Sequence, residues 1–260
     1  MLSDFLGVPA QDRHRIVQWS VDFIDFFNIF PITVDSATRM IESTRAMQAY
    51  TLALLEERRR APREDFLGIL LRHAGTPDGP TTEEIVGNAM LLLLAGHAAV
   101  RNLIGNVVWL LLTRPDENRK LDADPTLLRA AIDETLRFEP PVTLIPRIAL
   151  EPISVCGNSI PAGAVVQLSL AAANRDLAHF PDPDRFDIAR QPKQLMSFGH
   201  GPHGCAGVNL ARLQSEIALR TLLSRHPELA LDPERPITWY RTAANRGPVN
   251  LPLKTAAIRA

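Results

Sequence analysis

The sequence predicts a mainly α-helical protein with a small β region. Apolar residues recur at helical spacing through the first 140 residues, whereas residues 141–175 break into short extended pieces separated by glycine and proline. With 260 residues, of which 46% are hydrophobic and 22% charged, the chain is long enough to bury a sizeable core. We therefore expect a folded, globular protein.

Two long helices are predicted before Pro62. The segment DRHRIVQWSVDFIDFF (12–27) repeats apolar residues at helical spacing, and residues 34–60 continue this pattern for several turns. The three arginines at 58–60 are expected to form a solvated helix end, because cations are favourable near the C-terminal end of the helix dipole.

The longest helix, of roughly 32 residues, is predicted within GPTTEEIVGNAMLLLLAGHAAVRNLIGNVVWLLLTRP (79–115). Thr81 and Glu84 have the capping-box spacing at its start, and Pro115 marks its end. At about 1.5 Å per residue such a helix extends to roughly 48 Å, so we expect it to cross the whole fold. Residues 89–112 are apolar on nearly every side, which predicts burial, and such a helix can form one wall of an internal cavity.

The remaining elements are shorter. A helix in PTLLRAAIDETLRFEPP (125–141) is ended by its two prolines, and short strands are expected within TLIPRIAL, EPISVCG, SIPAG and AVVQLSL. An irregular segment (173–194) then leads to a glycine-rich loop and to a helix in VNLARLQSEIALRTLLSRHP (208–227). The last 30 residues predict a small hairpin or loop.

Charge and cysteine content narrow the classes of partner and location. A formal net charge of −1 gives no basic field for nucleic acid or an anionic membrane, so we expect neither as a partner. The first residues, MLSDFLGVPAQDRHR, lack the pattern of a secretory signal, and two cysteines in a chain this long do not make a disulfide framework. We therefore expect a cytoplasmic protein with reduced cysteines.

The loop FGHGPHGCAG (198–207) places Cys205 among four glycines and two histidines. Alone, Cys205 fits a small buried hydrophobe, a zinc ligand beside His200 and His203 without an evident fourth ligand, or a catalytic thiol without an evident base. A further interpretation uses the whole loop, because glycines let the backbone approach a flat ligand and the following helix N-terminus favours a thiolate. A thiolate presented over an apolar cavity suits a haem iron.

This loop resembles the haem-binding loop of the cytochrome P450 family, which reads Phe, Gly, any residue, Gly, any residue, His or Arg, any residue, Cys, any residue, Gly. Three further features follow in the family's order. Glu134 and Arg137 match its Glu-x-x-Arg, Arg185 in FPDPDRF supplies its expected arginine, and LLLLAGHAAVRNL occupies the place of its central oxygen-activating helix. The resemblance covers essentially the whole chain.

The resemblance implies haem b (iron protoporphyrin IX) as the cofactor and a role for each residue of its site. The cofactor-binding residues would be Arg147, Phe198, Gly199, His203, Cys205 and Gly207. Cys205 would be the axial thiolate and the metal ligand, and Phe198 the ring that shields its sulfur. His203 and Arg147 would donate hydrogen bonds to the haem propionates.

The resemblance also implies a structural ion-pair network. Glu134, Arg137 and Arg185 would form a buried network that holds the irregular meander segment against the core. Because an unpaired buried charge is costly, we expect the loss of one partner to disrupt the fold rather than the chemistry.

One departure from the family is length, since its members carry an additional N-terminal region of about a third of their chain. We therefore expect a cytochrome P450 fold that lacks roughly its N-terminal third, with 1–260 as a single partial domain. In that domain, 1–140 is helical, 141–175 forms the small β region, and 176–260 holds the meander, the haem-binding loop, the last long helix and a C-terminal β/loop segment.

A second departure lies in the central helix, at the catalytic positions Ala98 and Ala99. The family usually has an acid and a threonine there, and this pair delivers protons, a task that alanine cannot perform. A substrate hydroxyl or carboxylate could supply the missing group. His97 occupies a variable position, for which we expect a packing or hydrogen-bonding role.

The resemblance implies a haem-thiolate monooxygenase that oxidises a hydrophobic small molecule with dioxygen and electrons from a ferredoxin-type partner. The two alanines favour an alternative, a peroxide-dependent or non-oxidative haem enzyme. The missing region favours another, a non-catalytic homologue that binds a partner enzyme. It also predicts an exposed apolar surface and therefore self-association.

Overall fold

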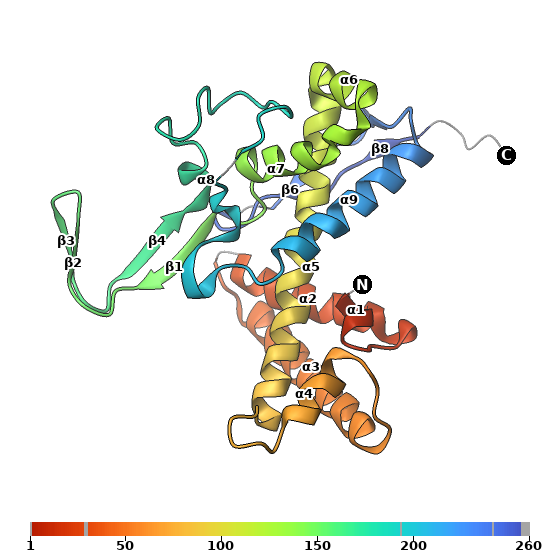
Figure 1. Ribbon diagram of the computed structural model, residues 1–260, viewed down its shortest axis with the longest axis vertical. Coiled ribbons are helices and arrows are strands. Elements are labelled where there is room, and N and C mark those ends of the chain that lie inside the picture. The colour runs from red at the N-terminus through yellow and green to blue at the C-terminus, as the bar shows by residue number, and fades with distance from the viewer. Residues whose placement is uncertain (1, 29–30, 193, 241, 256–260) are drawn as a thin grey trace. The chain divides into compact units, whose positions relative to one another are not determined.

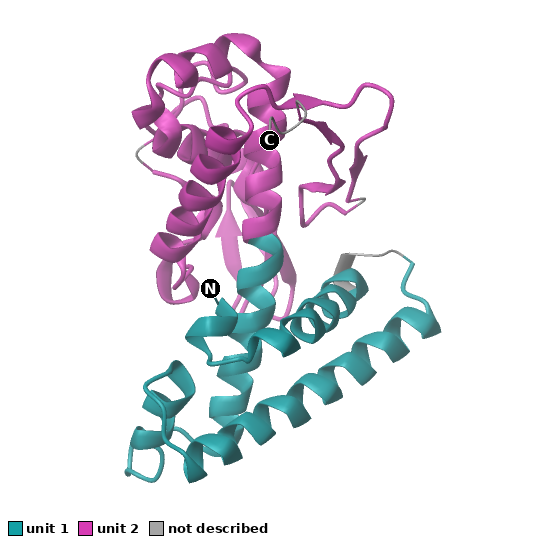
Figure 2. Cartoon of the chain, turned by 90° about the vertical axis from the view of Figure 1, so that its right-hand side faces the viewer, with its two compact units in different colours: residues 1–99 teal, residues 100–260 magenta. Residues whose placement is uncertain are grey.

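The computed structural model describes residues 2–28, 31–192, 194–240 and 242–255 (Figure 1). The chain forms two compact units, residues 1–99 and 100–260, which Figure 2 shows in different colours. The expectation of one partial domain over 1–260 stays a prediction.

Unit 1 is helical. It contains α1 (Leu2–Phe5), α2 (Arg13–Asn28), α3 (Val34–Arg60), α4 (Phe66–His73) and the first part of α5 (Thr82–Thr113), with a 3₁₀ turn at Ala10–Asp12. The predicted helices at 12–27, at 34–60 and within 79–115 are confirmed. Helices α2 and α3 pack against each other, and the unit's core includes Met47, Leu55 and Ile85, which are all but inaccessible to solvent.

The two longest helices begin at capping boxes. The Ser36 N–H donates to Thr33 Oγ1 at 3.1 Å and the Thr33 N–H to Ser36 Oγ at 3.0 Å, which starts α3. The predicted box at α5 is confirmed, since the Thr81 N–H donates to Glu84 Oε2 at 2.8 Å and the Glu84 N–H to Thr81 Oγ1 at 3.2 Å. These reciprocal bonds satisfy N–H groups that helix geometry leaves unpaired.

Arg58 corrects the prediction of a fully solvated helix end. Its side chain is buried, with Nε 2.7 Å from Asp65 Oδ2 and Nη2 donating to the Gly7 carbonyl at 2.7 Å. Gly7 has φ +67°, and a Cβ there would collide with both Asp65 and Arg58. Because Asp65 also caps α4, through the Gly68 N–H at 2.9 Å, the arginine joins three segments and is held inside.

Unit 2 combines helices with short hairpins. Its helices are the second part of α5, α6 (Pro115–Ala123), α7 (Leu128–Phe138), α8 (Leu170–Ala173) and α9 (Val208–Arg225), with 3₁₀ turns at Pro125–Leu127, Met196–Phe198 (η3) and Gly201–His203 (η4). Its strands are β1 (Leu144–Ile148), β2 (Ile153–Val155), β3 (Asn158–Ile160), β4 (Val165–Ser169), β5 (Ala230–Leu231), β6 (Thr238–Trp239), β7 (Pro248–Asn250) and β8 (Leu253–Lys254).

The strands described pair as four antiparallel ladders, β1 with β4, β2 with β3, β5 with β8 and β6 with β7. The β1–β4 register places Arg147 opposite Val166. The predicted small β region and C-terminal hairpin are therefore confirmed as elements.

The second part of helix α5 lies in the core of unit 2. Val107, Leu110 and Leu111 are buried with residues of α7 and α9. Asn106, also buried, donates to the carbonyls of Glu139 at 3.0 Å and Arg246 at 3.1 Å, and so ties two loops to the helix. Over the described residues, α5 alone is long and apolar enough to span a membrane by length and composition, although core helices share these properties.

Burial of α5 is less complete than predicted. Of an apolar stretch of 18 residues within the helix, 39% is buried, and Leu91 is 60% exposed. The sequence pattern shows which faces are apolar, but it does not show which of them another segment covers.

Candidate functional site

The loop that carries Cys205 is closed by its own backbone. It runs from η3 through η4 to Gly207, directly before α9 (Figure 1). The Cys205 N–H donates to the Phe198 carbonyl at 2.9 Å, and the Gly204 N–H to the Gly201 carbonyl at 2.9 Å. The first bond brings Cys205 back to Phe198, where the predicted motif begins, and the second closes a turn between them.

Glycines are required at particular points of the loop. Gly199 and Gly201 have φ of +68° and +78°, a region that residues with a Cβ rarely adopt. A Cβ at Gly207 would lie 3.8 Å from Cys205 Sγ, an ordinary van der Waals contact, so glycine leaves the sulfur less covered there without being sterically required. Cys205 itself is exposed, which excludes the interpretation of a small buried hydrophobe.

Metal binding by a side-chain cluster finds no support in the described part of the chain. There, no three His, Cys, Asp or Glu side chains are grouped so that they could hold a metal ion. His200 and His203 are exposed beside Cys205. Cys156 and Cys205 are both free thiols.

Phe198 is fixed by a residue that the sequence did not single out. The ring is half-buried against the core, and the guanidinium carbon of Arg212 lies 5.1 Å from its centroid. Arg212 is held by Asp133, with Nε 2.7 Å from Oδ1. This cation–π contact restrains the aromatic side chain at the start of the loop.

The predicted pair Glu134 and Arg137 is confirmed as a fully buried, bidentate ion pair. Arg137 Nε and Nη2 donate to the two carboxylate oxygens, each at 2.8 Å. Arg137 also donates to the carbonyls of Asn174 at 3.2 Å, Pro183 at 2.8 Å and Arg185 at 3.0 Å. One guanidinium therefore anchors several turns of the meander.

The prediction that the Arg185 side chain belongs to this buried network is wrong. Its side chain is 63% exposed, with Nη2 3.7 Å from Asp187 Oδ2, and its backbone carbonyl is the group that accepts from Arg137. Arg190 joins the network instead, with Nε 3.1 Å from Glu134 Oε1 and a side chain 14% exposed.

The fold of the meander explains why Arg190, and not Arg185, is buried beside Glu134. Arg190 Nη1 donates to the Pro181 carbonyl at 2.5 Å, and Nη2 donates to the carbonyls of Asp182 at 2.9 Å and Arg185 at 3.0 Å. The turn is wrapped around this guanidinium, which places Arg190 inside and the Arg185 side chain outside.

We expect Arg190→Ala to destabilise the protein more than Arg185→Ala. Losing Arg190 leaves the Pro181 carbonyl without its donor and removes one donor each from the Asp182 and Arg185 carbonyls and from the buried Glu134 carboxylate. We expect this to cost about 1–3 kcal/mol, whereas an exposed substitution usually changes stability by less than about 0.5 kcal/mol. Urea unfolding of the two variants measures the difference. Equal midpoints would contradict the assignment of Arg190 to the network.

A second carboxylate holds the meander through α6. Glu117 Oε2 accepts the Ile188 N–H at 3.1 Å, and Lys120 Nζ lies 2.8 Å from Glu117 Oε1 and 3.4 Å from Asp187 Oδ1. The hydrogen bond to Glu117 raises the pKa of Lys120. The pKa of Asp187 is lowered. Burial alone would raise this pKa, but the hydrogen bond from the Ala189 N–H and the nearby Lys120 cation together lower it by more. The stability that Asp187 contributes is therefore present above its ordinary value of 3.8 and is lost on acidification.

The other predicted site residues lie on separate elements. Ala98 is buried and Ala99 half-buried on α5, in unit 1. Arg147 lies on β1, where its Nη1 donates to the Pro146 carbonyl at 2.8 Å. Their roles, and those of Phe198 and His203 toward a cofactor, stay predictions.

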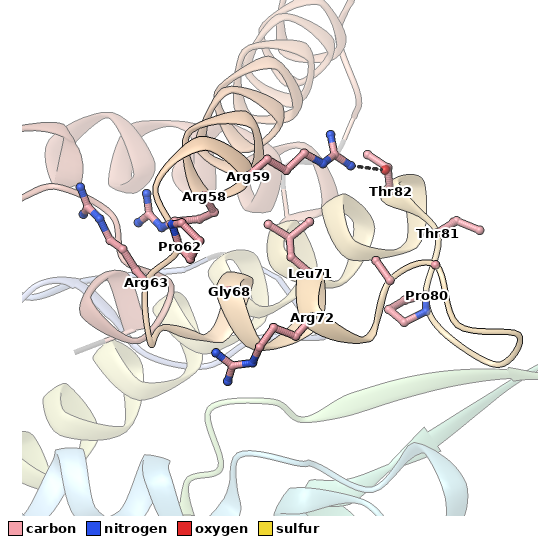
Figure 3. Close-up of a pocket in the computed structure, with 12 residues that line it drawn as sticks. Arg58, Arg59, Pro62, Arg63, Gly68, Leu71, Arg72, Pro80, Thr81 and Thr82 are labelled. Atoms are coloured by element: carbon pink, nitrogen blue, oxygen red, sulfur yellow. Dashed lines mark hydrogen bonds between the residues drawn. The ribbon is translucent and has the colours of Figure 1, made fainter.

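A cavity of about 580 Å³ in unit 1, at the end of α3, α4 and the start of α5, contains none of the predicted site residues (Figure 3). Its lining includes Arg58, Arg59, Arg63 and Arg72. Each of these arginines lies against a carboxylate of the same region, Asp65, Glu56, Glu57 or Glu64. The cavity therefore carries no uncompensated positive charge for an anionic ligand.

Comparison with known proteins identifies the family. Residues 120–239 match the family model described as Cytochrome P450. A structure of CYP109E1 from Bacillus megaterium in complex with testosterone is similar with a TM-score of 0.89 at 30% identity, over 98% of this chain and 69% of that chain. The chain belongs to the cytochrome P450 family.

Further cytochrome P450 relatives agree. A structure of P450BioI in complex with an acyl carrier protein ligated to hexadec-9Z-enoic acid has a TM-score of 0.91 at 36% identity, over 98% of this chain and 65% of that one. Cytochrome P450 monooxygenase PikC of Streptomyces venezuelae is 40% identical over 258 residues, 98% of this chain and 60% of that protein. The predicted fold class is thus confirmed, and the chain spans about 60% of the length of such relatives.

Members of the cytochrome P450 family bind haem b, and the loop fits that group. Cys205 is exposed ahead of the N-terminus of α9, and Gly207 leaves room beside its sulfur. A thiolate is a known axial ligand of haem iron, and a helix N-terminus stabilises negative charge. Cys205 is therefore the residue that would hold the iron.

Proposed function

We propose that the protein is a haem-thiolate monooxygenase, an oxidoreductase that oxidises a hydrophobic small molecule with dioxygen and electrons from a ferredoxin-type partner. The observation that carries the proposal is the closed loop in which Cys205 is exposed beside glycines and ahead of α9. The names of relatives, which include monooxygenases and hydroxylases, support the reaction class.

Haem, when bound, supplies the redox-active iron for oxygen chemistry. The chain's own residues would bind and orient it. Cys205 would donate its thiolate, Phe198 would cover the sulfur from a position fixed by Arg212, and His203 and Arg147 would donate to the propionates. The hydrogen-bonded loop would keep the sulfur in place throughout.

A hydrophobic substrate is supported by the relatives. One solved structure holds testosterone, and another holds a sixteen-carbon acyl chain on a carrier protein. We propose a free small molecule of this apolar class.

We propose a cytoplasmic location and self-association. Bacterial relatives and two free cysteines support the location, and the exposed apolar side chains of Ile148, Leu150 and Val165 support self-association.

A peroxide-dependent or non-oxidative haem enzyme is the second candidate, favoured by Ala98 and Ala99. Neither alanine can hold or move a proton, so the chain lacks an acid at the positions where the family usually carries one. The substrate's own hydroxyl or carboxylate would replace this acid in the first proposal, and peroxide would remove the need for it in the second.

The double substitution Ala98→Glu with Ala99→Thr separates these proposals. If dioxygen is the oxidant and proton delivery limits turnover, product formed per electron consumed should rise, by less than the about 10²–10⁴-fold that a natural, positioned acid contributes. If the substrate supplies the proton or peroxide is the oxidant, the yield should stay flat or fall. The measurement compares product per electron with dioxygen and product per peroxide in both proteins.

Asn88→Glu is the matched control, since it adds a carboxylate at an exposed position of the same helix, ten residues and about 15 Å before Ala98. It should leave both yields unchanged. Equal inactivity with both oxidants, in haem-loaded protein supplied with a substrate that binds, would contradict oxidation altogether and favour a non-oxidative enzyme or a non-catalytic homologue.

A further inference from the structure

Asn174 is a fully buried amide whose side chain is bound to the segment before the cysteine loop. Its Oδ1 accepts the Met196 N–H at 2.8 Å, and its Nδ2 donates to Ser197 Oγ at 2.7 Å and to the Leu136 carbonyl at 3.4 Å. Ser197 Oγ in turn donates to the same Leu136 carbonyl at 2.5 Å. One planar amide thus supplies both a donor and an acceptor to η3.

The backbone of Asn174 connects this contact to the buried ion pair. Its carbonyl accepts from Arg137 Nη1 at 3.2 Å, and Arg137 is bound to Glu134. On the other side, η3 ends at Phe198, whose carbonyl accepts the Cys205 N–H. Hydrogen bonds therefore join the ion pair to Asn174, Asn174 to Met196, and Phe198 to Cys205, and the short chain segment of η3 connects Met196 to Phe198.

We propose that Asn174 is a positioning residue that fixes η3 and, through the Phe198 carbonyl, the place of Cys205. The chemistry of the side chain supports this role, because alanine lacks both groups and leaves the Met196 N–H and the Ser197 hydroxyl without their buried partner. The consequence for haem ligation rests on the proposed function, whereas the effect on the loop does not.

Asn106 provides a matched control. It is equally buried in the same unit and donates to two carbonyls, those of Glu139 and Arg246, but it has no bond to the loop. Asn106→Ala and Asn174→Ala should both lower the melting temperature. Only Asn174→Ala should loosen the cysteine loop.

The test measures amide hydrogen exchange in the protein without added haem, each variant at the same interval below its melting temperature. Asn174→Ala should accelerate exchange at Met196 and Cys205 about tenfold or more relative to wild type, since losing a buried hydrogen-bond partner shifts a local opening equilibrium by that order. Ser197→Ala, which keeps Asn174 and truncates its partner, should shift the same amides in the same direction.

A second measurement adds haem, reduces the protein and treats it with carbon monoxide. Asn174→Ala should lower the fraction with the red-shifted Soret band of thiolate ligation, and Asn106→Ala should not. Unchanged exchange at Cys205 in both Asn174→Ala and Ser197→Ala, or equal acceleration in Asn106→Ala, would overturn the proposal. Absence of the band in wild-type protein would contradict the proposed function alone, because the exchange result does not depend on haem.

Discussion

We expect Cys205→Ser protein to show no red-shifted Soret band when it is loaded with haem, reduced and treated with carbon monoxide. The band reports a thiolate on the iron, and a serine hydroxyl is not ionised at neutral pH. Wild-type protein should show it, because Cys205 is exposed on the loop that the Phe198 carbonyl closes. The expected effect is complete loss rather than a reduction.

The matched control is Cys156→Ser. Cys156 is the other exposed free cysteine and lies in the turn between β2 and β3, away from the loop in sequence. This variant should keep the band. If the band survives Cys205→Ser or disappears with Cys156→Ser, another side chain holds the iron.

Arg137→Met should unfold the protein or leave it only marginally stable. The substitution leaves Glu134 buried with only Arg190 as a cation, and it removes the Arg137 donor from the carbonyls of Asn174, Pro183 and Arg185, the last of which keeps Arg190. Breaking one side of a buried ion pair costs about 3–5 kcal/mol, against a total stability of about 5–15 kcal/mol for ordinary domains. Guanidinium unfolding followed by circular dichroism measures this loss.

Arg220→Met is the comparison, because Arg220 forms a similar pair on α9 but on the surface. Its Nη2 lies 2.8 Å from Glu216 Oε1, and its side chain is 59% exposed. Losing such a pair costs about 0.3–0.5 kcal/mol. Similar unfolding midpoints for the two variants would show that burial of the Arg137 pair does not determine stability.

The sequence predicted the long helices closely because their signals are local. Apolar spacing placed α2, α3 and α5, and the Thr81–Glu84 capping box placed the start of α5. Helices α4 and α6 were missed for different reasons. The eight-residue α4 is too short to show a clear period, and Pro115, taken as the end of α5, is also the first residue of α6.

The candidate site was predicted as a motif, and its supporting residues were not. The loop from Phe198 to Gly207 is recognisable because glycine, histidine and cysteine recur at fixed spacing. Arg190 was confused with Arg185 because only the turn geometry decides which arginine points inward. Nothing in the sequence around Asn174 separates a buried amide from a surface one, and its partners are 22 and 23 residues further along the chain.

The bond from Asn106 to the Arg246 carbonyl has a consequence for synthesis on the ribosome. Its two ends are 140 residues apart, which at about 5–20 residues per second corresponds to roughly 7–28 s of translation. For much of that interval the core partners of Val107 and Leu111 on and after α9, such as Leu219 and Leu229, have not been synthesised. The nascent chain therefore exposes the apolar side chains of α5 for many seconds, and we expect chaperones to bind it during synthesis.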